Sequence, residues 1–209
     1  MAQLRINPNR MELSRLKRRL TTARRGHKLL RDKRDEMMRR FIGMARQNLE
    51  VRAHVEAALQ DALRQFAEAR AAMPRESLEE ALLYPARQMT AQTSEYAIMS
   101  VAVPRIEITD SGQPSLSYGL AQTSGALDAA IAGLADILPA MVELAALEKT
   151  VNRLADEIER TRRRVNALEF KTVPEMEQSI RAITMKLDEN ERGNLVRLMK
   201  IKEILRKRV

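Results

Sequence analysis

Apolar and small residues recur along the first third of the chain with alternating gaps of three and four. The pattern runs from Leu13 to Ala62, and Arg34 and Asn48 fill two places where it turns polar. This spacing places its members on one face of a helix, and a seam sustained over many heptads is typical of a coiled coil. Asn9 is a suitable N-cap, and Glu12 could complete a capping box. No further proline occurs before Pro74, so we predict one helix over residues 9–72.

The last third of the chain repeats the pattern. Apolar residues follow the same spacing from Val151 to Thr172, and the stripe resumes at Met176 and continues to Leu205. Between Leu168 and Ile180 the gaps are four residues each, which is a stutter that locally unwinds a supercoil. Pro174 lies inside this stretch and weakens the helix there. We therefore predict a phase correction and a bend near Pro174.

The two long helices are expected to form an antiparallel coiled coil with their ends flush. In that register the numbers of facing residues add up to about 217, which pairs Leu16 with Ile201 and Gly26 with Gly193. Apolar residues then meet apolar ones at each layer. The facing glycines would indicate a close approach of the two backbones.

Residues 73–122 differ from the rest of the chain. The segment "PRESLEEALLYPARQ" predicts one or two short helices ended by Pro85. The segment "IMSVAVPRIEITDSGQPSLSYG" predicts a hairpin with strands near 98–108 and 115–119, joined by turn residues at 110–114. A helix is expected to resume from Ser124, with Pro139 marking a second start or a kink.

These elements predict an all-α fold in three segments. Residues 1–72 form the N-terminal coiled-coil helix, 73–122 the short helices and the hairpin, and 123–209 the C-terminal coiled-coil helix. Only 3 % of the 209 residues are aromatic, which supports long helices over a broad globular core.

The net charge of +9 is unevenly distributed. Residues 1–46 carry 15 basic and 4 acidic residues, and residues 160–209 carry 14 and 7, whereas residues 47–159 carry 8 and 17. If the two ends of the chain lie side by side, one end of the molecule is basic and the other acidic.

Several classes of chemistry are not expected. The chain has no cysteine, so disulfides and thiolate metal sites are excluded. It has no nucleophile elbow, P-loop, dinucleotide fingerprint or HExxH motif. His27 falls on the seam and His54 is expected to face solvent, far from any ligand partner. We therefore expect no catalytic residue, no metal and no cofactor.

The location follows from two further features. No run of about 18 apolar residues is evident, so no membrane span is expected. The start "MAQLRINPNR" lacks the apolar region of a signal peptide. A cytoplasmic protein, possibly at a membrane surface, is the default expectation.

The basic runs at 15–19, 24–28 and 162–164 admit more than one interpretation. They could be a solvated coiled-coil face, a contact surface for an oppositely charged protein, or a phosphate-binding surface for nucleic acid. Against the last, helical spacing distributes the charges around the helix and no aromatic side chains accompany them. A free-standing scaffold coiled coil is a further alternative.

Taken together, three stretches resemble the D subunit of the V-type rotary ATPases (ATP synthases) of bacteria. They are "NPNRMELSRLKRRLTTARRGHKLLRDKRDEMMRRF" (7–41), "MSVAVPRI" (99–106) and "EKTVNRLADEIERTRRRVNALEFKTVPEMEQSIRAITMKLDENERGNLVRLMKIK" (148–202). The resemblance covers nearly the whole chain.

The resemblance implies a central rotor shaft that is not itself catalytic. Its partners would be the hexamer of A and B subunits, the small F subunit of the central stalk, and the funnel-shaped subunit that caps the membrane rotor ring. ATP hydrolysis or synthesis, coupled to proton or sodium transport, would occur in the rest of the complex. The chain would be cytoplasmic and peripheral to the membrane, with no direct span and no nucleic acid.

Two sets of contact residues are hypothesised. The hexamer would be contacted by basic residues near the flush end of the coiled coil: Arg10, Lys17, Arg18, Arg197, Lys200 and Lys202. The small stalk protein would bind the acidic segments 47–72 and 140–159 beside the hairpin, through Val55, Leu59, Leu154 and Ile158.

Overall fold

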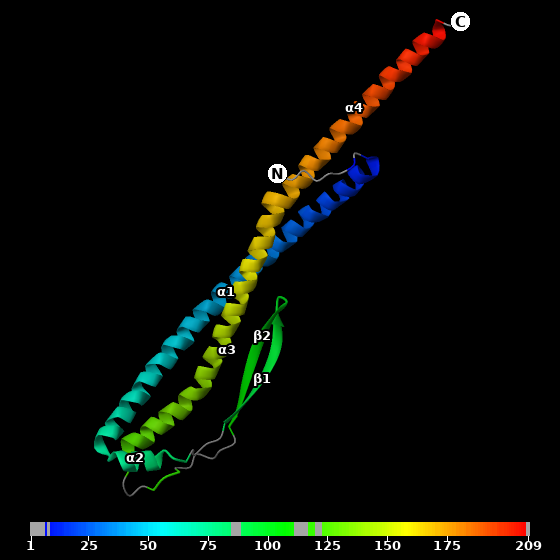
Figure 1. Cartoon of the computed structure of the whole chain (residues 1–209). Helices are drawn as coiled ribbons and strands as arrows, with labels where there is room; N and C mark the ends of the chain where they lie inside the picture. Colours follow the sequence, from blue (N-terminus) through cyan, green and yellow to red (C-terminus); the bar gives the residue numbers. More distant parts are fainter. Residues whose placement is uncertain (1–6, 8, 85–88, 111–116, 120–122, 208–209) are drawn as a thin grey trace. The chain divides into compact units, whose positions relative to one another are not determined.

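The computed structural model describes residues 7, 9–84, 89–110, 117–119 and 123–207. Its elements are, in chain order (Figure 1), α1 (Arg10–Ala72), α2 (Arg75–Ala81), β1 (Met89–Ile98), β2 (Val101–Asp110), α3 (Gly125–Ala167), the π-helix η1 (Leu168–Thr172) and α4 (Val173–Arg206). The predicted class, long N- and C-terminal helices with a small hairpin between them, is confirmed. The chain divides into two compact units, described separately below: unit 1 is 1–36 with 159–209, and unit 2 is 37–158.

Helix α1 has the predicted bounds because its start is capped. The side-chain oxygen of Asn9 accepts a hydrogen bond from the backbone N–H of Met11 at 3.2 Å, and the Asn9 carbonyl accepts from Leu13 at 3.0 Å. These bonds satisfy backbone groups that would otherwise lack partners at a helix start. Glu12 accepts a hydrogen bond from Arg15 at 3.4 Å.

In unit 1 the start of α1 packs antiparallel to η1 and α4. Arg10 is ion-paired with Glu191, and Arg24 is ion-paired with Glu177 at 2.7 Å. A later residue of α1 therefore pairs with an earlier residue of α4, as in an antiparallel pair. Leu16, Val165 and Ile183 are among the buried side chains of this unit. The predicted antiparallel pairing is therefore confirmed.

The predicted flush register is wrong. Arg24 pairs with Glu177, whereas the flush register places Gly193, sixteen positions later, opposite Arg24 or its neighbours. At 1.5 Å per residue this shift is roughly 24 Å. Leu, Ile and Ala fill the seam throughout, so many registers bring apolar residues together and the pattern alone does not select one. The expected glycine contact is also absent, since a Cβ built at Gly26 or Gly193 meets nothing within 4 Å.

In unit 2 the second part of α1 lies beside α3 (Figure 1). One cluster is formed by Val55 and Ala62 of α1 with Ile137 of α3. The close approach of backbones occurs here, because a Cβ at Gly133 would lie 3.4 Å from the Cβ of Ala62. A polar atom also lies in this region: the side-chain nitrogen of Asn48 is buried and has no hydrogen-bond partner in the part of the chain that is described.

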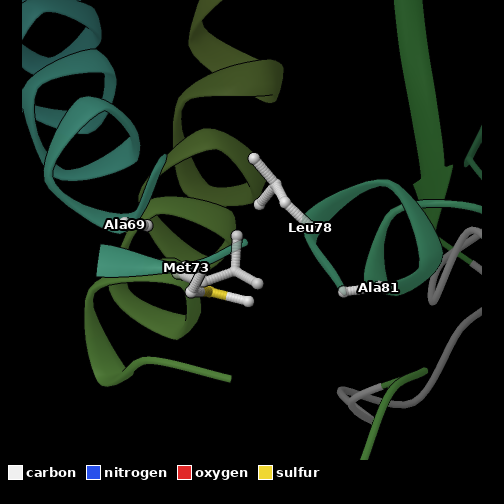
Figure 2. Packing of buried hydrophobic residues seen from close by; sticks show 5 residues of the cluster. Ala69, Met73, Leu78 and Ala81 are labelled. Carbon is white, nitrogen blue, oxygen red and sulfur yellow. The ribbon is translucent and has the colours of Figure 1, made fainter. Parts of the chain in front are cut away.

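A second cluster closes the end of this helix pair. Figure 2 shows Ala69 of α1 and the adjacent Met73 near Leu78 and Ala81 of α2. Leu127 of α3 completes the cluster. The predicted short helix therefore exists, although it ends at Ala81, before Pro85.

The hairpin lies earlier in the sequence than predicted. Strands β1 and β2 pair antiparallel with Ile98 opposite Val101, so the turn is Met99–Ser100, inside the predicted first strand. Both turn residues have positive φ, 50° and 73°, as a two-residue hairpin turn of type I′ requires. Neither is Gly, Asn or Asp, so the sequence carried no turn signal there. Of the predicted turn at 110–114, residues 111–114 lie outside the described residues.

Helix α3 begins as predicted and continues through Pro139. Ser124 caps it, with its hydroxyl accepting from the N–H of Ala126 at 3.2 Å. Of the two alternatives expected at Pro139, the second start is wrong, because the helix is continuous there. The kink at Pro139 stays a prediction.

One stretch of the helical run Gly125–Arg206 meets the length and composition of a membrane span. Its 18-residue window has a mean hydropathy of 1.8, and 11 % of that window is buried. The expectation that no segment qualifies was therefore too strict. Packing against α1 accounts for part of the apolar character, because Leu127 and Ile137 belong to the two clusters of unit 2.

Candidate functional site

The three basic residues of α1 proposed to contact the hexamer lie together. Arg10, Lys17 and Arg18 are exposed on α1 and line one shallow groove of about 360 Å³. Arg10 is engaged with Glu191 of α4, but its side chain remains 78 % exposed. An exposed pair of this kind contributes about 1 kcal/mol or less, so it leaves Arg10 able to exchange partners.

The three basic residues of α4 lie elsewhere. Since Arg10 is level with Glu191, Arg197, Lys200 and Lys202 extend roughly 9–16 Å beyond the start of α1. All side chains from Glu191 to Lys207 are exposed. The six predicted residues therefore form two groups at different levels, because the helix ends are staggered and not flush.

The projecting part of α4 is apolar as well as basic, which the sequence analysis missed. Leu198, Met199 and Ile201 are 62 %, 65 % and 53 % exposed. Large apolar side chains left in solvent over several turns indicate a surface that is covered in an assembly. The heptad pattern gave no signal for this, because Leu198 and Ile201 would have been seam residues in the flush register.

A wider groove lies between α1 and the C-terminal helix of unit 1. It encloses about 910 Å³ and is lined by Arg15, Arg18 and Arg19 of α1 together with Leu168 and Met176. Near it, the side chain of Phe170 on η1 is 75 % exposed. The apolar floor and basic rim of this groove suit a protein segment that carries carboxylates.

The two histidines behave as the sequence predicted. His27 is only 21 % exposed on its side chain, and its Nε2 lies 3.3 Å from Oε2 of Glu169 across the helix pair. His54 is exposed. Within the described residues, no group of three or more His, Asp or Glu side chains is placed to hold a metal ion.

Of the four residues proposed for the small stalk protein, three are already buried within the chain. Val55, Leu154 and Ile158 are 4 %, 0 % and 8 % exposed, whereas Leu59 is half-buried. The apolar spacing that suggested them identifies the seam of the helix pair, which packs inward. A direct contact with a partner needs exposed residues in the same region.

Such residues lie beside the seam on both helices. Leu59 and Leu63 each follow a seam residue of α1 by one position, and Leu138 and Met141 do the same on α3. In two antiparallel right-handed helices, a step of one residue from the seam turns toward the same side on both. Leu63, Leu138 and Met141 are 52 %, 38 % and 40 % exposed. Because Gly133 touches Ala62, Leu138 lies about level with position 57 of α1 and Met141 with position 54, so these residues follow one another over roughly 13 Å and form one apolar strip.

Two titratable groups of unit 2 show shifted pKa values. Partial burial raises the pKa of Tyr118 to about 12, and its hydroxyl also donates a 2.5 Å hydrogen bond to Asp128. The hydrogen bond to Glu56 raises the pKa of Arg52, with Glu148 across the helix pair adding to it. Burial and a hydrogen bond account for the shift at Tyr118, and a surface ion pair accounts for the one at Arg52.

The chain was compared with known protein families and with curated relatives. Residues 12–203 match the family of ATP synthase D subunits. The chain belongs to this family. A relative from Clostridium novyi (strain NT), named as the D subunit of a V-type ATP synthase, is 52 % identical over 211 residues, which cover 99 % of this chain and 98 % of the relative.

Further relatives agree. The proteins of the same name from Acetivibrio thermocellus and Thermoanaerobacter sp. (strain X514) are 51 % and 50 % identical. The alignments cover 98 % and 99 % of this chain, and 94 % and 100 % of the relatives. A V-type ATP synthase is membrane-associated, so this chain is part of a membrane-associated complex.

Proposed function

We propose that this chain is the central rotor shaft of its complex. It would transmit rotation between a catalytic hexamer of A and B subunits and the ion-translocating rotor ring in the membrane, during ATP hydrolysis or synthesis coupled to proton or sodium transport. It would contribute no catalytic group and would lie on the cytoplasmic side, peripheral to the membrane. The observation that carries the proposal is the antiparallel pairing of the first and last helices, seen in the Arg10–Glu191 and Arg24–Glu177 pairs.

The charge distribution supports contact with a carboxylate-lined partner. Unit 1 contains 26 basic and 12 acidic residues, whereas unit 2 contains 11 and 16. The fold therefore gathers the two basic ends of the sequence into one unit. Many exposed, weak and screened contacts can guide a turning shaft without fixing it at one angle, since each contributes about 1 kcal/mol or less.

The first test neutralises the proposed hexamer contacts. Glutamine at all six positions, Arg10, Lys17, Arg18, Arg197, Lys200 and Lys202, should weaken binding of the shaft to the hexamer at least tenfold, because about 1.4 kcal/mol corresponds to a factor of ten. Binding would be measured by co-purification and by titration at two salt concentrations. The wild-type chain should lose affinity as salt rises, and the variant should lose less.

A matched control removes the same charge from unit 2. It replaces six exposed arginines by glutamine: Arg46, Arg52, Arg64, Arg70, Arg75 and Arg105. This variant should bind the hexamer as the wild type does. Equal binding by the wild type and both variants would remove the proposed role of the basic contacts.

For the small F subunit of the central stalk we propose the region of Val55, Leu59, Leu154 and Ile158. Leu59 lies in the apolar strip with Leu63, Leu138 and Met141, where a partner can reach it. Val55, Leu154 and Ile158 would act indirectly, by holding the helix pair together. The funnel-shaped subunit is proposed to bind at another exposed apolar site of unit 2, Leu83 and Tyr84, which are 67 % and 69 % exposed.

The strip can be tested without damage to the seam. The triple change Leu63→Ser, Leu138→Ser and Met141→Ser should abolish capture of the small stalk protein while helix content, measured by circular dichroism, stays constant. The double change Leu83→Ser and Tyr84→Ser serves as the control and should leave capture intact. Loss of capture in the control, or retention in the triple variant, contradicts the assignment.

A further inference from the structure

The two outer edges of the hairpin differ in their free hydrogen-bonding groups. In a two-residue hairpin the pair next to the turn, Ile98 and Val101, exchanges both backbone hydrogen bonds, and bonded and non-bonded pairs then alternate. On β1 the backbone groups of Ala91, Thr93, Glu95 and Ala97 therefore point outward. On β2 the outward groups include those of Ala102, Pro104, Ile106 and Ile108.

The edge of β2 is blocked. Pro104 has no N–H to offer, and the carbonyl of Ala102 accepts a 2.7 Å hydrogen bond from the guanidinium of Arg153. Pro104, Ile106 and Ile108 are half-buried and line a groove with residues of α3 such as Val142. A further strand that paired with this edge would lack one N–H partner at Pro104 and would have to displace Arg153 from the carbonyl of Ala102.

The edge of β1 is open over most of its length. All residues from Thr90 to Ala97 are exposed, and the strand contains neither proline nor lysine, the residues that proteins use to protect an edge. Its one charged side chain, Glu95, is paired with Arg153 at 3.1 Å. The strand otherwise presents Thr, Ala, Gln, Ser and Tyr, so this edge is uncharged apart from the paired Glu95, and its Thr and Tyr residues favour strands.

We propose that the outer edge of β1 binds an extended, uncharged segment of a protein that turns together with this chain, as a third strand of the hairpin sheet. Main-chain hydrogen bonds supply the affinity in this mode of binding, and side chains of the occupant meet alternate residues of β1. The fixed geometry of strand pairing explains why the partner must turn together with this chain. Strand pairing has a fixed register, so pairing with the stationary hexamer would lock rotation, whereas pairing with a co-rotating protein would not. The inference rests on the proposed function in this respect.

Residue-resolved amide hydrogen exchange tests the proposal. In the isolated chain the amides of Gln92, Ser94 and Tyr96, which bond to β2, should exchange more slowly than those of Ala91, Thr93 and Glu95. In the reconstituted central stalk, with the small and funnel-shaped subunits bound, the second group should slow at least tenfold. Unchanged exchange of this group in a fully formed stalk overturns the inference and leaves the shaft function standing. Failure of the stalk to form contradicts the shaft function itself.

Two variants isolate the edge. Thr93→Pro removes one outward N–H and no bond to β2, and it should abolish the added protection at Ala91 and Glu95. Thr93→Val keeps the N–H and should behave as the wild type. If the amides of β1 become protected only after the hexamer is added, the occupant belongs to the hexamer, and the proposal of a co-rotating partner is overturned. An isolated chain with the mass of a dimer and the second group already protected would make the occupant a second copy, which also overturns the proposal.

Discussion

Tyr118 shows how a single residue ties an irregular segment to the helical scaffold. It packs against the cluster around Met73 and Leu127, and its hydroxyl reaches Asp128 in the first turn of α3. Partial burial disfavours the phenolate, and the neighbouring carboxylate adds to this effect, so the pKa of Tyr118 rises to about 12. Protonated Tyr118 therefore stabilises the fold.

This stabilisation should disappear at high pH. Below pH 10 the tyrosine is protonated in both the folded and the unfolded chain, and its contribution is complete. Between pH 10 and 12 the unfolded chain loses the proton first, so the free energy of unfolding falls, in total by about 1–2 kcal/mol for a partly buried group. Tyr118→Phe should lower stability by about 1 kcal/mol at pH 7 and flatten this decline.

The measurement is urea unfolding at intervals from pH 8 to 12. Tyr96→Phe is the matched control, because it removes a tyrosine hydroxyl from a side chain that is 46 % exposed on β1. If the Tyr118 variant declines with the same slope as the wild type, the hydrogen bond to Asp128 does not control the titration.

At the scale of elements, the π-helix η1 explains the irregular apolar spacing before Pro174. Three gaps of four residues exceed the regular pattern by one residue, and a π turn absorbs one extra residue. The N–H of Val173 bonds to the carbonyl of Leu168, five residues back, and the hydroxyl of Thr172 donates to the carbonyl of Ala167 at 3.2 Å. The predicted phase correction thus exists, whereas the bend at Pro174 stays a prediction.

Deleting Phe170 should convert η1 into regular α-helix. The side chain is exposed, and removal of the extra residue leaves the flanking buried residues Val165 and Ile183 in phase. We expect the free energy of unfolding to change by less than about 1 kcal/mol. Deletion of the exposed Arg181, where no extra residue is present, should rotate the following helix by about 100° and remove Ile183 from the interface. Urea unfolding compares the two, and an equal loss of stability would contradict the assignment.

The elements also show which structural features a single sequence reveals. The bounds of α1 follow from Asn9 and Pro74, because capping groups and prolines act locally. The register of the two long helices does not follow from such local signals, because it depends on small energy differences between layers that are all apolar. The hairpin turn at Met99–Ser100 escaped prediction because neither residue type favours the positive φ that the turn between β1 and β2 requires.

At the scale of the whole molecule, the charge pattern of the sequence carried the most functional information. Two basic ends and an acidic middle predict two chemically different units if the ends meet, and unit 1 does combine residues 1–36 and 159–209. The individual contact residues were harder to predict. Heptad periodicity identifies apolar positions, but exposure separates the buried Val55 and Leu154 from the accessible Leu63 and Met141.

The central claim is that this chain turns inside a catalytic hexamer. The wild type has no cysteine, so Ser100→Cys at the hairpin turn allows one probe to be attached to the shaft. With the hexamer fixed to a surface and ATP supplied, single-molecule imaging should show the probe rotating in one direction, and rotation should stop when ATP is withheld. A probe that stays bound and stationary while the hexamer hydrolyses ATP would contradict the account.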